Sequence, residues 1–229
     1  MFRLGFLRCW LALGCLATLT GCHSFLGYRG WPFPEIDNTT FVTPTMRKDT
    51  IRQYAARADG TDSSDQRAAS DQLARQIQIE PDPLVRETII RAIAEFHTPL
   101  AGQVLEAGLN DDNQLVRVAC CQTLGKRADE HSVTALASAL RQDKQMDVRL
   151  AAAEALGKIK SPSAVSALAV ALDDHDPAMQ FAGMQSMKSV TGKDYGGDVQ
   201  AWRQVAAGGN PAPPPAPSIA SRLKEYSPF

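Results

Sequence analysis

The sequence predicts an all-α fold, a short α-solenoid in which helical hairpins stack on one another. The first observation is an internal repeat: Leu-Val-Arg-Val-Ala at 115–119 precedes Leu-Gly-Lys at 124–126, and Asp-Val-Arg-Leu-Ala at 147–151 precedes Leu-Gly-Lys at 156–158. The offset between the two arginines is 149 − 117 = 32 residues, and the offset between the two glycines is the same. A fixed period of ~20–50 residues is typical of stacked repeats. The second observation is composition, because 44% hydrophobic and 21% charged residues indicate a globular chain.

The first segment, residues 1–21, is predicted to be a signal peptide. Arg3 and Arg8 give it a basic start, and residues 9–20 are apolar and uncharged. This run is too short for a membrane-spanning helix, which needs about 20 residues. A basic start, a short apolar run and small residues after it are typical of a secretory signal.

The end of this run, Leu19-Thr20-Gly21-Cys22, resembles the lipobox of bacterial lipoproteins. The resemblance implies cleavage before Cys22 and lipidation of its sulfur, so we expect a lipoprotein anchored to a membrane of the cell envelope. His23 follows the cysteine where an Asp would imply retention in the inner membrane, which favours the outer membrane. The alternative is an ordinary signal peptide cut near Gly21. Residues 22–47 then form a Gly- and Pro-containing linker from the lipidated cysteine.

Residues 48–190 are predicted to form the solenoid. Helices are expected over 48–58, with Thr45 as a candidate N-cap, and over 63–79. The first helices of four further units are expected to start near Asp82, Asn113, Gln145 and Asp176. Asp-Pro at two of these starts is physically suitable, because Asp accepts from free N–H groups and Pro has none to leave unsatisfied.

Second helices are expected over 100–109, 132–140 and 163–172, with leucines in two columns at the repeat spacing. One column is Leu105, Leu136 and Leu168, and the other is Leu109, Leu140 and Leu172. A single helical hairpin cannot bury its apolar face, so these columns are expected in a core shared by neighbours. Gly125 and Gly157 are expected to end the first helices in the left-handed cap conformation.

These features resemble the HEAT-like repeats of the phycobilisome-lyase type. The shared features are a D-P-x-V-R start at Asp82, an Ala-rich first helix ending in Leu-Gly, and a second helix with spaced leucines, over about residues 82–187. The resemblance implies the fold. It leaves function open, because the same repeat serves lyases, hydroxylases and passive scaffolds.

Candidate chemistry is sparse. The hydroxylase built on this scaffold binds iron through His-Glu dipeptides, and none occurs in this sequence; His97, His131 and His175 are expected in solvated turns. Cys120 and Cys121 align with Ala152 and Ala153, which predicts core packing. We therefore expect no catalytic residue, no metal and no cofactor.

A column of arginines at repeat spacing predicts Arg–Asp ladders between units rather than an anion site: Arg86, Arg117 and Arg149. The formal net charge is −1, so nothing favours nucleic acid, whose binding depends on neutralising phosphates.

A protein or peptide partner is the expected ligand. The outward positions of the second helices form a polar column, and a second column lies one heptad further on. The expected contacts are Gln103, Thr134 and Ser166, then Asn110, Arg141 and Asp173. In the repeat class that the chain resembles, second helices line the concave face, and solenoids bind along such faces.

Residues 191–207 are predicted to cap the array, with Asp198 starting a short helix and Trp202 covering the last unit. Residues 208–229 are a Pro-rich tail with a short amphipathic end at Ile219, Leu223 and Tyr226. The leading hypothesis is a lipid-anchored envelope scaffold. The alternatives are a lyase-like enzyme that holds a small molecule on its concave face, and a structural assembly subunit.

Overall fold

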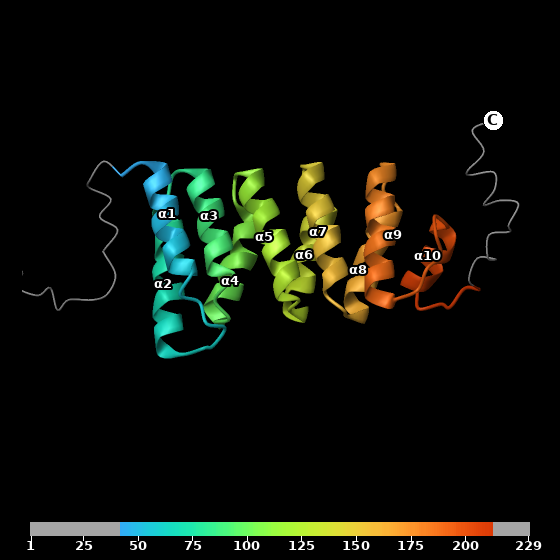
Figure 1. The fold of residues 1–229 in the computed structure, drawn as a ribbon. Helices are drawn as coiled ribbons and strands as arrows, with labels where there is room; N and C mark the ends of the chain where they lie inside the picture. The colour runs from blue at the N-terminus through green and yellow to red at the C-terminus, as the bar shows by residue number, and fades with distance from the viewer. Residues whose placement is uncertain (1–41, 213–229) are drawn as a thin grey trace, which may run out of the picture. The chain divides into compact units, whose positions relative to one another are not determined.

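The computed structural model describes residues 42–212, and these residues form ten α-helices and two short 3₁₀ helices. The predictions for the signal peptide, Cys22, most of the linker and the amphipathic end lie outside the described residues. The helices stand side by side in one row from α1 to α10 (Figure 1). Their bounds are α1 Pro44–Ala55, α2 Ser64–Ile79, α3 Pro83–Ile93, α4 Pro99–Ala107, η1 Gly108–Asn110, α5 Gln114–Arg127, η2 Glu130–Ser132, α6 Val133–Gln142, α7 Met146–Lys158, α8 Pro162–Leu172, α9 Pro177–Thr191 and α10 Val199–Ala206.

The row is built from hairpins arranged in two layers. The first helices α1, α3, α5, α7 and α9 each pack on the next along the row. Among the second helices, α2 packs on α4, α6 packs on α8, and α8 packs on α10, whereas α4 and α6 have few direct contacts. The all-α prediction is confirmed. None of the helices in residues 42–212 is long and apolar enough to cross a membrane.

The four predicted starts of first helices are confirmed as N-cap positions. Asp82, Asn113 and Asp176 each accept a hydrogen bond from the backbone N–H two residues on, at 2.8–2.9 Å, whereas Gln145 makes no side-chain cap. Thr45 is not an N-cap. Helix α1 starts two residues earlier, because Pro44 takes the first helical position and Thr43 accepts from the N–H of Met46.

The two predicted leucine columns are buried, as expected. Every member of both columns is at most 8% exposed, and all belong to one apolar core that also contains Cys120 and Cys121. The core therefore runs through the described repeats without interruption, which is how stacked hairpins bury faces that no single hairpin can cover.

The prediction that Gly125 and Gly157 end their helices is wrong. Both lie inside helices, α5 and α7, where they allow close contact between first helices. A Cβ on Gly125 would lie 2.7 Å from the Cα of Ala155, and one on Gly157 would lie 2.8 Å from the Cα of Ser186. The left-handed residue that ends α5 is Ala128, at φ 52°.

These contacts predict opposite effects for the same substitution at two helical glycines. Gly102→Ala in α4 meets only the flexible end of Arg127, at 3.9 Å, so it should stabilise the fold by about 0.8–1 kcal/mol through helix propensity. Gly125→Ala should instead destabilise it, because overpacking against the α7 backbone costs about 1–3 kcal/mol. Urea unfolding followed by circular dichroism measures both. A stabilising Gly125→Ala would show that the helices can separate at little cost.

Candidate partner-binding face

The polar residues predicted to bind a partner all lie on the exposed surface of the second-helix layer. Gln103 and Asn110 lie on α4 and η1, Thr134 and Arg141 on α6, and Ser166 on α8. Asp173, at the end of α8, is exposed but is held by Arg203 of α10 at 2.9 Å. Arg141 makes no ion pair with any residue in the 42–212 range. The face therefore offers uncharged polar groups and one uncommitted guanidinium.

The predicted Arg–Asp ladder is present. Arg86 pairs with Asp111 at 2.8 Å, Arg117 with Asp143 at 2.7 Å, and Arg149 approaches Asp174 at 3.9 Å. Each acid lies just before the next unit, and the ladder extends back to an Arg47–Glu80 pair at 2.9 Å. The arginines also donate to backbone carbonyls of the turn before their own helix. Because they are committed to these partners, they do not form an anion site.

The ladder arginines lower the pKa of the carboxyl groups with which they pair, Asp111 and Asp143. Burial alone would raise the pKa of Asp143, but hydrogen bonds from Arg117 and the N–H of Gln145 outweigh it, so the pKa lies below its ordinary value. The pKa of Asp111 is lowered in the same way, by Arg86 and the N–H of Asn113 against the effect of burial. Both carboxylates are therefore stabilised in their charged form by the folded state.

The last first helix, α9, carries Gln180 at the ladder position. Its amide donates to the carbonyl of Asp174 at 2.8 Å and so replaces the backbone bond that the arginines make. A neutral amide has no need of a carboxylate from a following unit. The ladder therefore ends at α9 with its backbone contact intact.

The cysteines and histidines lie where the sequence predicted. Cys120 and Cys121 are fully buried, and burial raises the pKa of both thiols, that of Cys121 to about 12. The three histidines of the repeats are exposed; His97 and His175 lie in turns, whereas His131 lies in the 3₁₀ helix η2. Within the described residues, no group of three His, Cys, Asp or Glu side chains could hold a metal ion.

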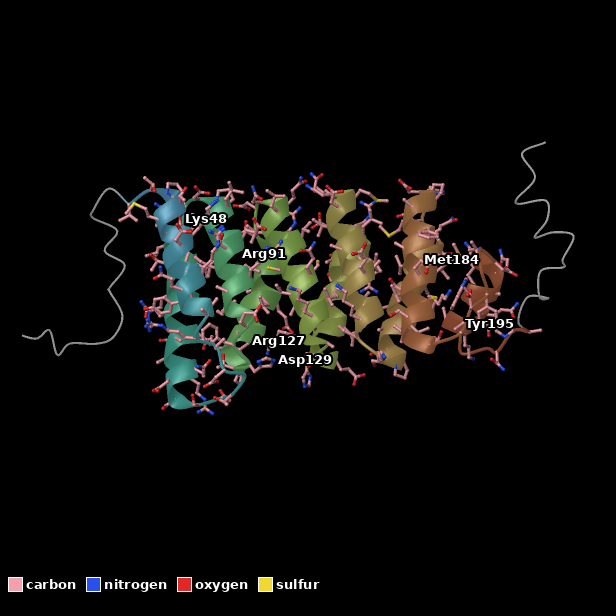
Figure 2. The ribbon with its side chains drawn as sticks, in the orientation of Figure 1. Lys48, Arg91, Arg127, Asp129, Met184 and Tyr195 are labelled. Atoms are coloured by element: carbon pink, nitrogen blue, oxygen red, sulfur yellow. The ribbon has the colours of Figure 1, made fainter. Side chains whose placement is uncertain are left out.

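The turns that connect the first and second helices of successive hairpins are also in contact with each other. Arg127, at the end of α5, donates to the carbonyl of Phe96 at 2.7 Å, which links two successive turns. Figure 2 shows Arg127 and Asp129 close together at the lower edge of the row, near its middle. The Asp129 carboxylate accepts from the N–H of His131 and so caps η2. Both groups have structural partners.

The segment predicted to cap the array contains the short helix α10. Asp198 accepts from the N–H groups of Gln200 and Ala201, and α10 packs on α8 and α9. Trp202 is 1% exposed, donates to the carbonyl of Gly196 at 3.1 Å, and meets the ring of Tyr195 edge-on. Tyr195 lies in this end of the row (Figure 2). Helix α10 thus takes the place of a second helix in the last unit.

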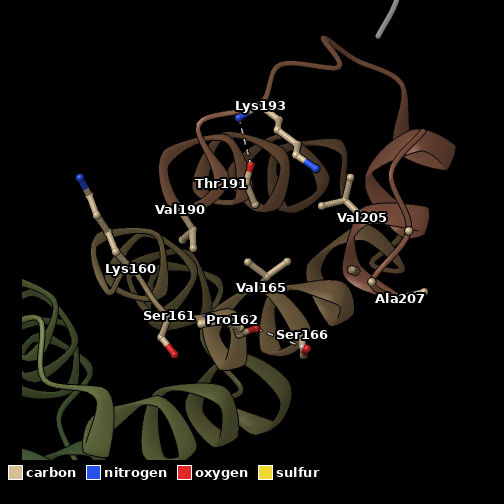
Figure 3. A pocket seen from close by; sticks show the side chains of 13 residues that line it. Lys160, Ser161, Pro162, Val165, Ser166, Val190, Thr191, Lys193, Val205 and Ala207 are labelled. Atoms are coloured by element: carbon tan, nitrogen blue, oxygen red, sulfur yellow. Dashed lines mark hydrogen bonds between the residues drawn. The ribbon is translucent and has the colours of Figure 1, made fainter. Parts of the chain in front are cut away.

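A groove of about 610 Å³ lies between α8, the end of α9 and α10 (Figure 3). Its lining includes Ser166, which the sequence singled out, and Lys160, Val190, Lys193 and Val205, which it did not. No local pattern marks these four residues, because they come from the start of α8, the end of α9 and α10, which are separate segments of the sequence. A smaller groove of about 400 Å³ lies between α1 and α3 on the first-helix layer.

Comparisons with known proteins agree with this architecture. Residues 103–188 match the family of HEAT repeats. Human deoxyhypusine hydroxylase in complex with glycerol is similar in structure, with TM-score 0.51 and 19% identity. The match covers 66% of this chain and 65% of the hydroxylase chain. This chain therefore spans just under two thirds of the hydroxylase.

The complex of CpcE and CpcF of phycocyanin lyase from Nostoc is also similar, with TM-score 0.50 and 21% identity over 72% of this chain and 70% of that one. No curated protein matches the sequence. At these identities the structural likenesses show the fold alone. The described part of this chain is an all-α stack of HEAT-like repeats.

Proposed function

We propose that this protein is a lipid-anchored scaffold of the cell envelope that binds a protein or peptide partner along its second-helix layer. The contact residues we assign are Gln103, Asn110, Thr134, Arg141 and Ser166. HEAT repeats generally mediate protein interactions, and solenoids bind along extended repeat surfaces. The finer assignment, to an envelope partner and to this face, is our inference.

One observation carries the proposal. The same outward position of successive second helices is exposed and polar, at Gln103, Thr134 and Ser166. The ladder arginines are paired, and both thiols are buried among apolar side chains. This distribution favours a binding surface over a reaction centre, so we assign no catalytic residue.

The binding face is tested by crosslinking in cells, followed by mass spectrometry of the membrane fraction. Arg141→Glu should reduce the yield of specific crosslinked proteins by roughly tenfold, because it reverses the one uncommitted charge of the face. Lys126→Glu is the matched control, since Lys126 is exposed on first helix α5. Equal crosslinking in wild type, variant and control would remove the face from the proposal.

The predicted lipid anchor at Cys22 is tested separately by Cys22→Ala. We expect this variant to leave the membrane fraction for the soluble periplasmic or secreted fraction, because stable anchoring needs the acyl chains attached at that cysteine. Fractionation and immunoblotting measure the change. Cys15→Ala, within the apolar run, should keep the protein on the membrane. Membrane association of Cys22→Ala equal to wild type would contradict the lipid anchor.

A further inference from the structure

The groove at the end of the second-helix layer has an apolar floor. Val165 of α8 and Val205 of α10 are largely buried beneath it, and Val190 near the end of α9 is half-buried beside them. In Figure 3 these three side chains come from three different helices and converge on one space. A floor of this kind accepts an aliphatic side chain but gives no specificity on its own.

The charges around the groove have one sign. Its thirteen lining residues include Lys160 and Lys193 and no Asp or Glu. Lys193 reaches over the groove towards Val205, whereas Lys160 lies beyond Val190 with its ammonium directed away from the three valines (Figure 3). Neither ammonium forms an ion pair with a carboxylate of residues 42–212; the Lys193 ammonium donates to the side-chain oxygen of Asn210, at 2.7 Å.

One carboxylate contacts the wall of the groove from outside its lining. The Glu130 carboxylate accepts from the hydroxyls of Ser161 and Ser163, so it is held at the start of α8 and does not line the groove. Asp194, next to Lys193 in sequence, is paired with Lys188. The charged side chains that line the groove are therefore both positive, in a chain whose formal net charge is −1.

The hydroxyl groups at the rim are oriented as acceptors. Ser166 donates its proton to the carbonyl of Pro162, and Thr191 donates to that of Met187. The Thr191 oxygen also accepts from the N–H of Lys193, at 3.2 Å, and keeps one lone pair for an incoming N–H group, whereas the Ser166 oxygen keeps two. A peptide backbone supplies such groups along its length, and the groove is open along one side, so a chain can enter and leave.

We propose that this groove binds a short segment of a protein partner in which an aliphatic side chain is flanked by acidic residues. The aliphatic side chain packs on the three valines, and the carboxylates pair with Lys193 and Lys160. Backbone N–H groups donate to Ser166 and Thr191. This inference rests on the proposed scaffold function and deepens it by naming the chemistry of the ligand at the Ser166 end of the face.

The test is selection of a random decapeptide library, displayed on phage, against the purified full chain. Enriched peptides are then synthesised with a fluorescent label and measured by fluorescence anisotropy. We expect enrichment of Asp or Glu next to Val, Ile or Leu. Lys160→Glu with Lys193→Glu should weaken binding of these peptides by roughly tenfold or more.

Two further variants separate a binding effect from a folding effect. Lys126→Glu with Lys144→Glu makes the same change in net charge outside the groove, and it should leave the affinity within about twofold. Ser166→Trp fills the groove from an exposed position and should abolish binding without changing the melting curve. Selection with no enrichment of acidic and aliphatic residues, or binding that survives both groove variants, overturns the proposal.

Two other outcomes are decisive. If the peptides bind only after residues 213–229 are deleted, the occupant is this chain's own segment, and the assignment to a partner is wrong. If no peptide is selected but the Arg141-dependent crosslinks persist, the groove proposal fails while the scaffold function stands. If no peptide is selected and the Arg141-dependent crosslinks are also absent, the proposed scaffold function is wrong as well.

Discussion

Trp202→Ala is expected to destabilise the stack by about 3–5 kcal/mol, the range for removing a buried Trp. The indole is 1% exposed, packs edge-on against Tyr195, and lies in the helix that covers the last unit. Its loss leaves a cavity under α10 and removes the hydrogen bond to Gly196. Urea unfolding followed by circular dichroism, together with the Tm, measures the effect.

The matched control for Trp202 is Phe181→Ala. Phe181 lies on α9 in the same unit but is 58% exposed, so its removal should change the free energy of unfolding by no more than about 0.5 kcal/mol. If Trp202→Ala unfolds at the same urea concentration as wild type, α10 does not stabilise the end of the array.

Arg117→Met is expected to destabilise the fold by roughly 2 kcal/mol at pH 7, near the middle of the range for hydrogen bonds to charged groups. The side chains of Arg117 and Asp143 are only 14% and 9% exposed, so the substitution strands a largely buried carboxylate. Arg75→Met is the control. It breaks a pair whose side chains are 68% and 49% exposed, and it should cost less than about 1 kcal/mol.

The pH dependence of the Arg117→Met effect distinguishes ion pairing from packing. Because the pKa of Asp143 is lowered in the folded state, the pair contributes fully above the unfolded pKa of about 3.9 and its contribution is lost as pH falls through the folded pKa. The difference between wild type and variant should therefore shrink when unfolding at pH 7 is compared with unfolding at pH 3. An equal difference at both pH values would mean that the arginine contributes through its methylene groups.

The sequence was sufficient to predict the features that depend on spacing along one helix. Asp82 and Asp176 start helices because capping is local, and Leu136 lies in the core because the repeat period fixes its neighbours. The Arg117–Asp143 pair follows from the same period. Gly125 was assigned wrongly, because a glycine near a helix end suits either a left-handed turn or a close contact, and only the neighbouring helix decides which.

The groove between α8, α9 and α10 could not be predicted from the sequence, for a different reason. Val165 and Val205 are forty residues apart, and nothing in either segment indicates that α10 takes the place of a second helix. That placement depends on how Trp202 fits against the last unit, which is a matter of shape. Lys160 and Lys193 become a feature only after the three helices have docked.

The ladder of Arg–Asp pairs ends at Gln180 of α9. Each ladder arginine pairs with an acid that lies just before the next unit, so an arginine at this position of the last unit would have no such partner. The neutral amide of Gln180 needs no carboxylate from a following unit. Arg203 of the last helix, α10, pairs with Asp173. The series of ion pairs along the first helices thus ends at α9, and we expect Gln180→Arg to leave a guanidinium without a carboxylate partner from a following unit.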